Sequence, residues 1–174
     1  QSAMRLRSTN AGDAAILAAL YSAAFPSEDL TPLVRRLLSE VPDILSLVAE
    51  VERGLAGHVV FTPCAIGGST QRVALLGPLA VAPAMQRRGV GTVLVKGGIA
   101  TLRDGGCTRV LVLGDPDYYG RFGFTREDRI QPPYALPTNW TDAWQGHALH
   151  ADAAPLAGLL CPPAPWMVPS LWAP

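Results

Sequence analysis

Residues 78–91, PLAVAPAMQRRGVG, constrain the fold of this chain more than any other stretch. An apolar run at Leu79–Val81 is typical of a strand, and a proline-containing turn follows it. The basic, glycine-spaced segment Gln86–Gly91 then leads directly into an amphipathic helix pattern. The first N–H groups of a helix have no partner within the helix and attract anions, and glycines let a ligand approach the backbone. The segment therefore predicts a strand, a turn and a helix start that bind a phosphate-bearing ligand.

Two other classes of phosphate site are excluded by the same segment. No Lys-Ser or Lys-Thr follows its glycines, so it is not a P-loop, and it lacks the third glycine and the acidic residue of a dinucleotide-binding fold. A glycine-rich helix start also serves close packing of a helix on a sheet. The turn alone leaves ligand binding and packing open.

A second informative segment is VLVLGDPDYYGRFGF at 110–124. Val110–Leu113 is a continuous apolar run, which suits a strand buried on both faces. Asp115 followed by Pro116 is typical of a helix N-cap and first turn. Because two glycines follow, the helix must be short, and it places Tyr119 just beyond the end of a central strand.

Both segments resemble motifs of the GNAT superfamily of N-acetyltransferases. The resemblance rests on Gln-x-x-Gly-x-Gly after a strand and on Tyr-x-x-x-Gly-Phe from Tyr119 to Phe124. Three stretches, GHVVF at 57–61, GPLAVAP at 77–83 and 114–124, are similar to the YhbS-like branch of predicted acetyltransferases. The likeness covers most of residues 4–150. It implies a mixed α/β fold with a mostly antiparallel sheet, splayed between strands near 72–82 and 108–114 and flanked by helices.

The resemblance also implies a cofactor, acetyl-coenzyme A, and a role for each motif. The backbone of the strand would pair with the pantetheine arm, the turn would hold the pyrophosphate, and the Tyr119 hydroxyl would protonate the departing thiolate. Many members of the family have a coenzyme-binding asparagine where this chain has Gly114-Asp115-Pro116. Asp115 replaces that contact or caps the helix, and we favour the cap. The cofactor-binding residues that the resemblance implies are Leu79, Ala80, Val81, Gln86, Arg87, Arg88, Gly89, Val90, Gly91, Asp115 and Tyr118.

The general base that an attacking amine needs is less well defined. The candidates are carboxylates, of which Glu28 and Glu50 rank first: Glu28 lies in the connection that borders the acceptor pocket in this family, and Glu50 shares a strand face with Glu52. Asp29 and Glu52 rank behind them as candidates for the base, and the three histidines rank last. We expect direct transfer of an acetyl group to a primary amine of a small molecule or a protein. The alternative is a non-catalytic module that senses acyl-coenzyme A.

Composition excludes several other classes of protein. The chain has 174 residues, 14 basic and 14 acidic, and this balance gives no overall attraction to nucleic acid or anionic membranes. The three cysteines are widely spaced without a CxxC pair, which disfavours disulfides and a metal site. No apolar run is long enough to span a membrane and no secretory signal pattern is present, so the expected location is the cytoplasm.

The expected organisation is one domain over residues 4–150 and an Ala-, Pro- and Trp-rich segment, 151–174, that packs on it or contacts a partner subunit in a homodimer. Expected strands are Met4–Arg7, Ile44–Glu52, Leu55–Thr62, Arg72–Val81, Thr108–Leu113 and Gly146–His150. Expected helices begin at a cap formed by Asn10 and Asp13, at Thr31-Pro32 and at Arg88. We expect the glycine pair Gly97-Gly98 to allow close packing of the last of these helices on the sheet.

Overall fold

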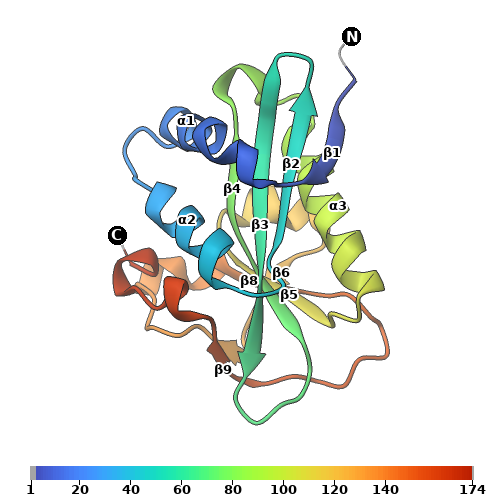
Figure 1. Cartoon of the computed structure of the whole chain (residues 1–174). Helices are drawn as coiled ribbons and strands as arrows, with labels where there is room; N and C mark the ends of the chain where they lie inside the picture. Colours follow the sequence, from blue (N-terminus) through green and yellow to red (C-terminus); the bar gives the residue numbers. More distant parts are fainter. Residues whose placement is uncertain (1–2, 174) are drawn as a thin grey trace. The chain divides into compact units, whose positions relative to one another are not determined.

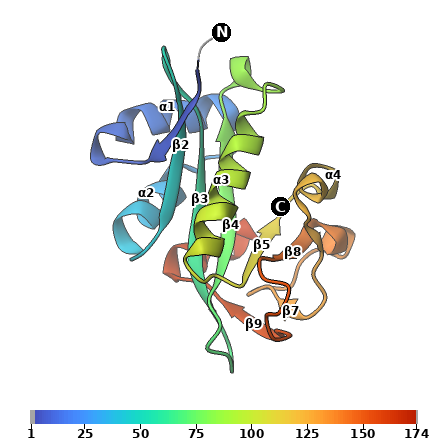
Figure 2. The ribbon, with the colours of Figure 1, turned by 90° about the vertical axis from the view of Figure 1, so that its right-hand side faces the viewer.

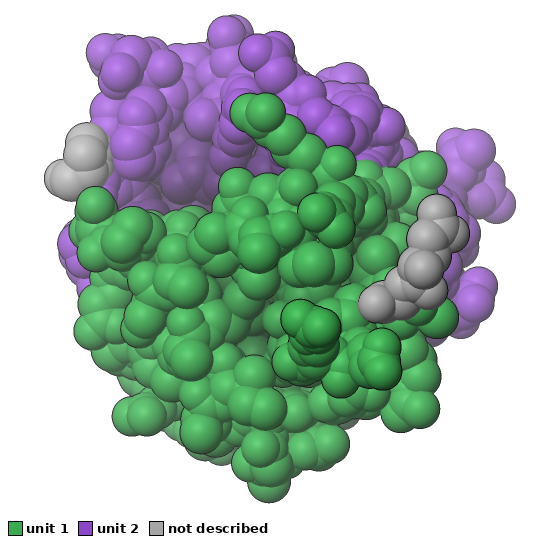
Figure 3. Space-filling model, turned by 90° about the horizontal axis from the view of Figure 1, so that it is seen from above, with its two compact units in different colours: residues 1–61, 77–98 green, residues 62–76, 99–174 purple. Residues whose placement is uncertain are grey.

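The computed structural model describes residues 3–173, whose contacts group into two compact units, each drawn in its own colour in Figure 3. Unit 1 comprises Gln1–Phe61 and Gly77–Gly98, and unit 2 comprises Thr62–Leu76 and Ile99–Pro174. Three elements run through both units: β3 (Gly54–Ile66), β4 (Val73–Val81) and α3 (Val90–Asp104). Unit 1 also contains β1 (Arg5–Ser8), α1 (Ala14–Ala24), α2 (Thr31–Glu40) and β2 (Leu45–Val51). Unit 2 also contains β5 (Arg109–Leu113), α4 (Pro116–Tyr119), β6 (Thr125–Arg126), β7 (Ile130–Gln131), β8 (Trp144–Ala148) and β9 (Gly158–Cys161).

The sheet of unit 1 is antiparallel where β1, β2 and β3 pair. Arg5 lies opposite Glu50, and Leu45 lies opposite Phe61 across the predicted β2–β3 hairpin. The register shifts by a bulge between Ala49 and Glu50. Strand β2 ends at Val51, so Glu52 lies in the turn and shares no strand face with Glu50. That part of the prediction was wrong, because the turn begins one residue earlier than expected.

Helices α1 and α2 cover one face of this sheet and the first half of α3 covers the other, as Figures 1 and 2 show. The predicted capping box forms: the Asn10 side chain accepts from the N–H of Gly12, and the Asp13 carboxylate accepts from the N–H of Asn10. It closes a 3-10 turn, Ala11–Asp13, that leads into α1. Helix α2 begins at Thr31, where a helix start was predicted, but Thr31 is its first residue and not its cap. The N–H of Thr31 donates to the Asp29 carboxylate.

The glycines of α3 allow close packing, as predicted. An added Cβ at Gly98 would collide with the ring of Phe61 on β3, and one at Gly97 would collide with Leu6 on β1. Gly57 on β3 is equally constrained, since its Cβ would lie 2.8 Å from the carbonyl oxygen of Ala80 and from Val90. Helix α3 therefore lies closer to the sheet than any side chain at these glycine positions would permit.

In unit 2, β4 and β5 pair in parallel from Val73↔Arg109 to Leu76↔Val112, and β8 pairs antiparallel with both β5 and β6. Strand β9 pairs with the end of β3 and with β7. The mixed α/β class with a large, mostly antiparallel sheet flanked by helices confirms the predicted fold class.

The last segment of the chain contains more regular structure than its proline content suggested. Strand β9 was not predicted, and the strand expected at Gly146–His150 is β8, which begins two residues earlier. Trp172 is 1% exposed, contacts the ring of Trp144 edge-on, and its indole N–H donates to the Trp166 carbonyl. Pro174, the end of the predicted 151–174 segment, lies outside the described residues. Over residues 3–173, no helix has both the length and the apolar character that a membrane span requires.

Candidate functional site

The basic turn before α3 has an unusual backbone. Arg87 and Gly89 have φ values of 63° and 83°, both in the left-handed region. For arginine this conformation is uncommon, and such residues cluster at ligand clamps. A turn of this kind directs successive N–H groups to one side and forms a concave anion site. Arg87, Arg88 and Gly89 are all exposed, so the turn is open to a ligand from solvent.

The start of α3 extends this anion site. The N–H of Val93 donates to the carbonyl of Gly89 at 3.0 Å, which closes the first turn of the helix. The N–H groups of Val90, Gly91 and Thr92 precede that bond and have no acceptor within the helix. An added Cβ at Gly89 would meet no atom within 4 Å, so a side chain there would occupy the space in front of the turn.

The end of β4 lies next to this turn in unit 1. The Gln86 side-chain amide donates to the Val81 carbonyl at 3.5 Å, and the N–H of Ala82 donates to Ala56 on β3 at 2.8 Å. Ala80 is fully buried, whereas Leu79 and Val81 are half-buried. The register of β4 with β5 covers Val73–Leu76, and Leu79–Val81 lie beyond it.

In unit 2, α4 carries Tyr118 and Tyr119 directly after β5. The Asp115 carboxylate accepts from the N–H of Asp117 at 2.9 Å, and the Asp115 carbonyl accepts from the N–H of Tyr119 at 3.0 Å. Asp115 therefore caps the helix, as we favoured from the sequence. Tyr118 stacks under the Arg121 guanidinium, 4.6 Å from the ring centroid, which fixes its orientation.

The ring of Tyr119 packs tightly at the end of β5. A Cβ on Gly114 would lie 2.5 Å from the ring, and the rings of Phe124 and Tyr118 lie 5.8 Å and 5.0 Å away between centroids. Burial raises the pKa of the Tyr119 hydroxyl well above its usual range, so this group carries its proton at neutral pH. Within residues 3–173, no group forms a hydrogen bond to this hydroxyl. The side chain is thus rigid and retains a proton that it can donate.

The two ranked base candidates lie in different environments of unit 1. Glu50 accepts from Nε of Arg7 at 3.1 Å and lies 3.8 Å from Arg5, and Arg7 also forms a two-pronged ion pair with the buried Asp13. Glu28 is exposed in the connection between α1 and α2, and none of the ion pairs within residues 3–173 includes it. Glu50 is thus engaged by two arginines, whereas Glu28 is open to solvent.

A buried polar chain in unit 1 was not predicted. His58 on β3 is fully buried, its Nδ1 lies 2.7 Å from the Tyr21 hydroxyl, and its Nε2 lies 2.7 Å from the Ser46 hydroxyl. The Ser46 hydroxyl is also hydrogen-bonded to Thr9. Burial lowers the pKa of His58 to about 4, so the ring is neutral at pH 7. The only signal in the sequence was a histidine within an apolar strand. Over residues 3–173 no cluster of His, Cys, Asp or Glu is placed to hold a metal ion.

Residues 14–124 match the acetyltransferase (GNAT) family. The chain is 35% identical over 157 residues to the uncharacterized N-acetyltransferase YjhQ of Escherichia coli, a match that covers 86% of this chain and 87% of that protein. It is 32% identical over 145 residues to the E. coli N-acetyltransferase YhbS, covering 81% of this chain and 84% of YhbS.

Solved structures show the same similarity in three dimensions. The crystal structure of E. coli YhbS in complex with CoA superposes with a TM-score of 0.82 at 30% identity and covers 92% of this chain and 89% of that one. A GNAT acetyltransferase from Brucella melitensis in complex with acetyl-CoA superposes with a TM-score of 0.76, again at 30% identity, over 95% of this chain and 99% of that one.

Proposed function

Because the chain belongs to the acetyltransferase (GNAT) family, we propose that it transfers the acetyl group of acetyl-CoA to a primary amine of a small molecule or a protein. The amine attacks the thioester directly while both substrates are bound, so no covalent enzyme intermediate is needed. Two relatives with solved structures bind CoA or acetyl-CoA, which supports this donor.

The observation that carries the proposal is the left-handed, exposed turn at Arg87–Gly89 in front of α3. We assign the pyrophosphate to the N–H groups of this turn and of the first residues of α3, with Arg87 and Arg88 neutralising its charge. The backbone groups of Leu79–Val81 lie beyond the register with β5, so they are the ones we assign to the pantetheine amides. Of the two residues of α4 and its cap that the resemblance implies for the cofactor, we keep Tyr118 in the proposed cofactor set and assign Asp115 to the helix cap that its carboxylate forms.

Tyr119 is the proposed general acid. As the amine attacks the carbonyl carbon, the carbon–sulfur bond breaks and the sulfur leaves as a thiolate that must gain a proton. The Tyr119 hydroxyl carries its proton at neutral pH and forms no hydrogen bond within residues 3–173, so that proton is available to the sulfur. Its ring is held by packing against Gly114 and Phe124, so its position is fixed before the donor binds.

Of the two ranked carboxylates, Glu28 is the one that we propose as the general base. Glu50 is paired with Arg7 and lies 3.8 Å from Arg5, so taking up a proton would weaken both of these ion pairs. Glu28 is exposed in the α1–α2 connection and is free to take the ammonium proton directly or through water.

The proposal is tested by mixing the protein with acetyl-CoA and a panel of primary amines and measuring the release of free thiol. Tyr119→Phe should lower kcat by about 10²-fold or more and leave the KM for acetyl-CoA unchanged. The matched control is Tyr134→Phe, another half-buried tyrosine that no motif includes. Full turnover in Tyr119→Phe would contradict its role, and tight acetyl-CoA binding without thiol release for any amine would favour the sensor.

A further inference from the structure

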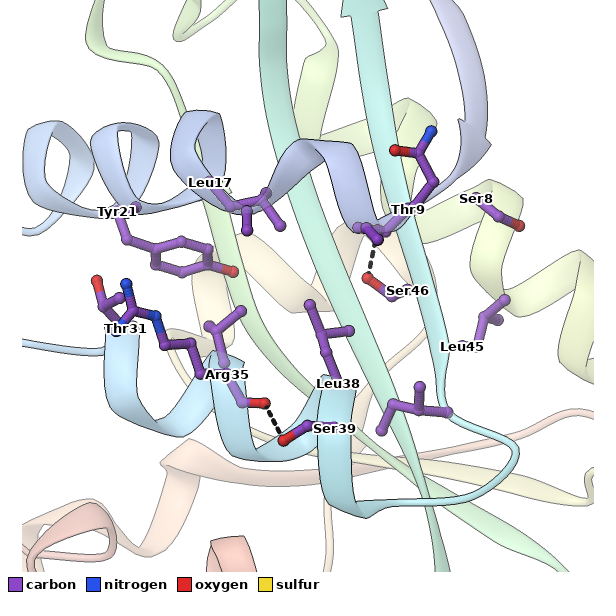
Figure 4. A pocket seen from close by; sticks show the side chains of 16 residues that line it. Ser8, Thr9, Leu17, Tyr21, Thr31, Arg35, Leu38, Ser39, Leu45 and Ser46 are labelled. Atoms are coloured by element: carbon purple, nitrogen blue, oxygen red, sulfur yellow. Dashed lines mark hydrogen bonds between the residues drawn. The ribbon is translucent and has the colours of Figure 1, made fainter.

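Unit 1 contains a cavity of about 630 Å³ between α1, α2 and the start of β2, shown in Figure 4. This volume falls within the range of small-molecule sites in proteins. Every residue that lines the cavity lies between Ser8 and Ser46. None of them belongs to the strand, turn and helix start to which we assign the cofactor.

The sequence of the two helices explains why the space stays open. Helix α1 presents Ala14, Leu17, Ala18 and Tyr21 to the cavity, a spacing of three and four residues that places them on one face. Two of the four are alanines, which leave room that larger side chains would fill. The facing stripe of α2 has the same spacing and includes Val34, Arg35 and Leu38.

The interior of the cavity is mainly apolar but includes hydroxyl groups at fixed positions. Thr9, Ser46 and Tyr21 line it, and all three belong to the chain that runs through the neutral His58. Each hydroxyl has one proton and two lone pairs, so capacity remains after the bonds within the chain are made. Figure 4 shows the Thr9–Ser46 bond at one end of the cavity and the Tyr21 ring at the other.

The charge of the lining is one-sided. Of the described residues that line it, Arg35 is the only charged one, and none is Asp or Glu. Arg35 is exposed, and no ion pair within residues 3–173 includes it, whereas the neighbouring Arg36 is paired with Glu40 at 2.9 Å. A bound ammonium group would meet a like charge here and no counter-ion, while a carboxylate would meet an available guanidinium.

We propose that this cavity binds a small monocarboxylate with an apolar body, whose carboxylate pairs with Arg35 while its body contacts the alanine and leucine side chains of α1 and α2. None of its lining residues is among those assigned above to acetyl-CoA, to the general acid or to the base. The inference therefore goes beyond the proposed acetyl transfer and does not depend on it.

The test is a calorimetric titration of the full chain with sodium octanoate, and with octylamine as the probe of opposite charge. We expect saturable binding of octanoate and none of octylamine. Ala18→Leu should abolish octanoate binding by filling the cavity, whereas Ala19→Leu, at the exposed neighbouring position outside the lining, should preserve it. Arg35→Gln should weaken octanoate binding, and the control Arg36→Gln should not.

Three results would overturn the proposal: no saturable binding of octanoate, binding that Ala18→Leu leaves unchanged, or octylamine binding as tightly as octanoate. Circular dichroism establishes whether Ala18→Leu is folded. If it is not, octanoate binding by Arg35→Gln and Arg36→Gln still tests the proposal, and equal binding by the two variants would contradict it. A parallel titration with acetyl-CoA separates this outcome from that of the proposed function, because the two sites share no residue.

Discussion

His58 is held between two hydroxyl groups in the interior of unit 1, and its environment makes stability depend on pH. The ordinary pKa of 6.5 applies to the unfolded chain, whereas burial lowers the pKa in the folded protein to about 4. Between these values the unfolded chain binds a proton that the folded protein does not. The free energy of unfolding should therefore fall by about 3 kcal/mol as the pH drops from 6.5 to 4.

Urea unfolding across this pH range measures the effect. His147 also has a pKa lowered by burial and contributes in the same direction, so the experiment is done in a His147→Gln background. Asp13 does not interfere, because its carboxyl pKa is lowered to about 2 by Arg7 and its contribution is lost only below its ordinary value of 3.8. Constant stability between pH 6.5 and 4 would contradict the account of His58.

The hydroxyl of Tyr21 is the second residue whose contribution can be measured. Tyr21→Phe leaves Nδ1 of His58 buried without a partner, so we expect it to lower the free energy of unfolding by about 1–3 kcal/mol. Ser46→Ala removes the partner on the other side of the ring, and the double variant measures the coupling through His58. Additive effects of the two substitutions would show that the hydroxyls do not act through one chain.

At the scale of elements, the contact of α3 with the sheet depends on glycine. Gly98→Ala places a methyl group against the ring of Phe61 and should destabilise the protein by about 1–3 kcal/mol. Gly120→Ala is the matched control, since Gly120 has a φ of −56° and open space where the Cβ would lie. Thermal unfolding should show a lower Tm for the first variant and little change for the second.

A compensating substitution tests whether the contact with Phe61 causes the loss of stability in Gly98→Ala. Phe61→Leu shortens the facing side chain and should return part of the stability that Gly98→Ala removes. A double variant that is less stable than the sum of the two single effects would show that the glycine serves another purpose.

Local signals in the sequence predicted local structure well. The caps formed by Asn10 and Asp115, the β2–β3 hairpin and the close packing of α3 depend on residues near in sequence or on glycine itself. The left-handed Arg87 was not predicted, because arginine carries no preference for that conformation.

Features that depend on distant residues were missed. The occupation of Glu50 by Arg7 joins residues 43 positions apart, and the bond from Tyr21 to His58 joins residues 37 apart. Strand β9 forms in a proline-rich segment because it pairs with β3 and β7, which no local pattern reveals. The cavity likewise results from how α1, α2 and β2 pack together.

For the whole molecule, the central claim is that the turn before α3 holds acetyl-CoA. The most direct measurement is a calorimetric titration of acetyl-CoA into the wild-type protein, Gly89→Trp and Gly106→Trp. Both glycines have left-handed φ values, 83° and 87°, and open space around an added Cβ, so the two variants carry the same backbone strain. We predict that the wild type and Gly106→Trp bind and that Gly89→Trp does not. A wild type that fails to bind, or a Gly89→Trp variant that binds as tightly as the wild type, would contradict the claim.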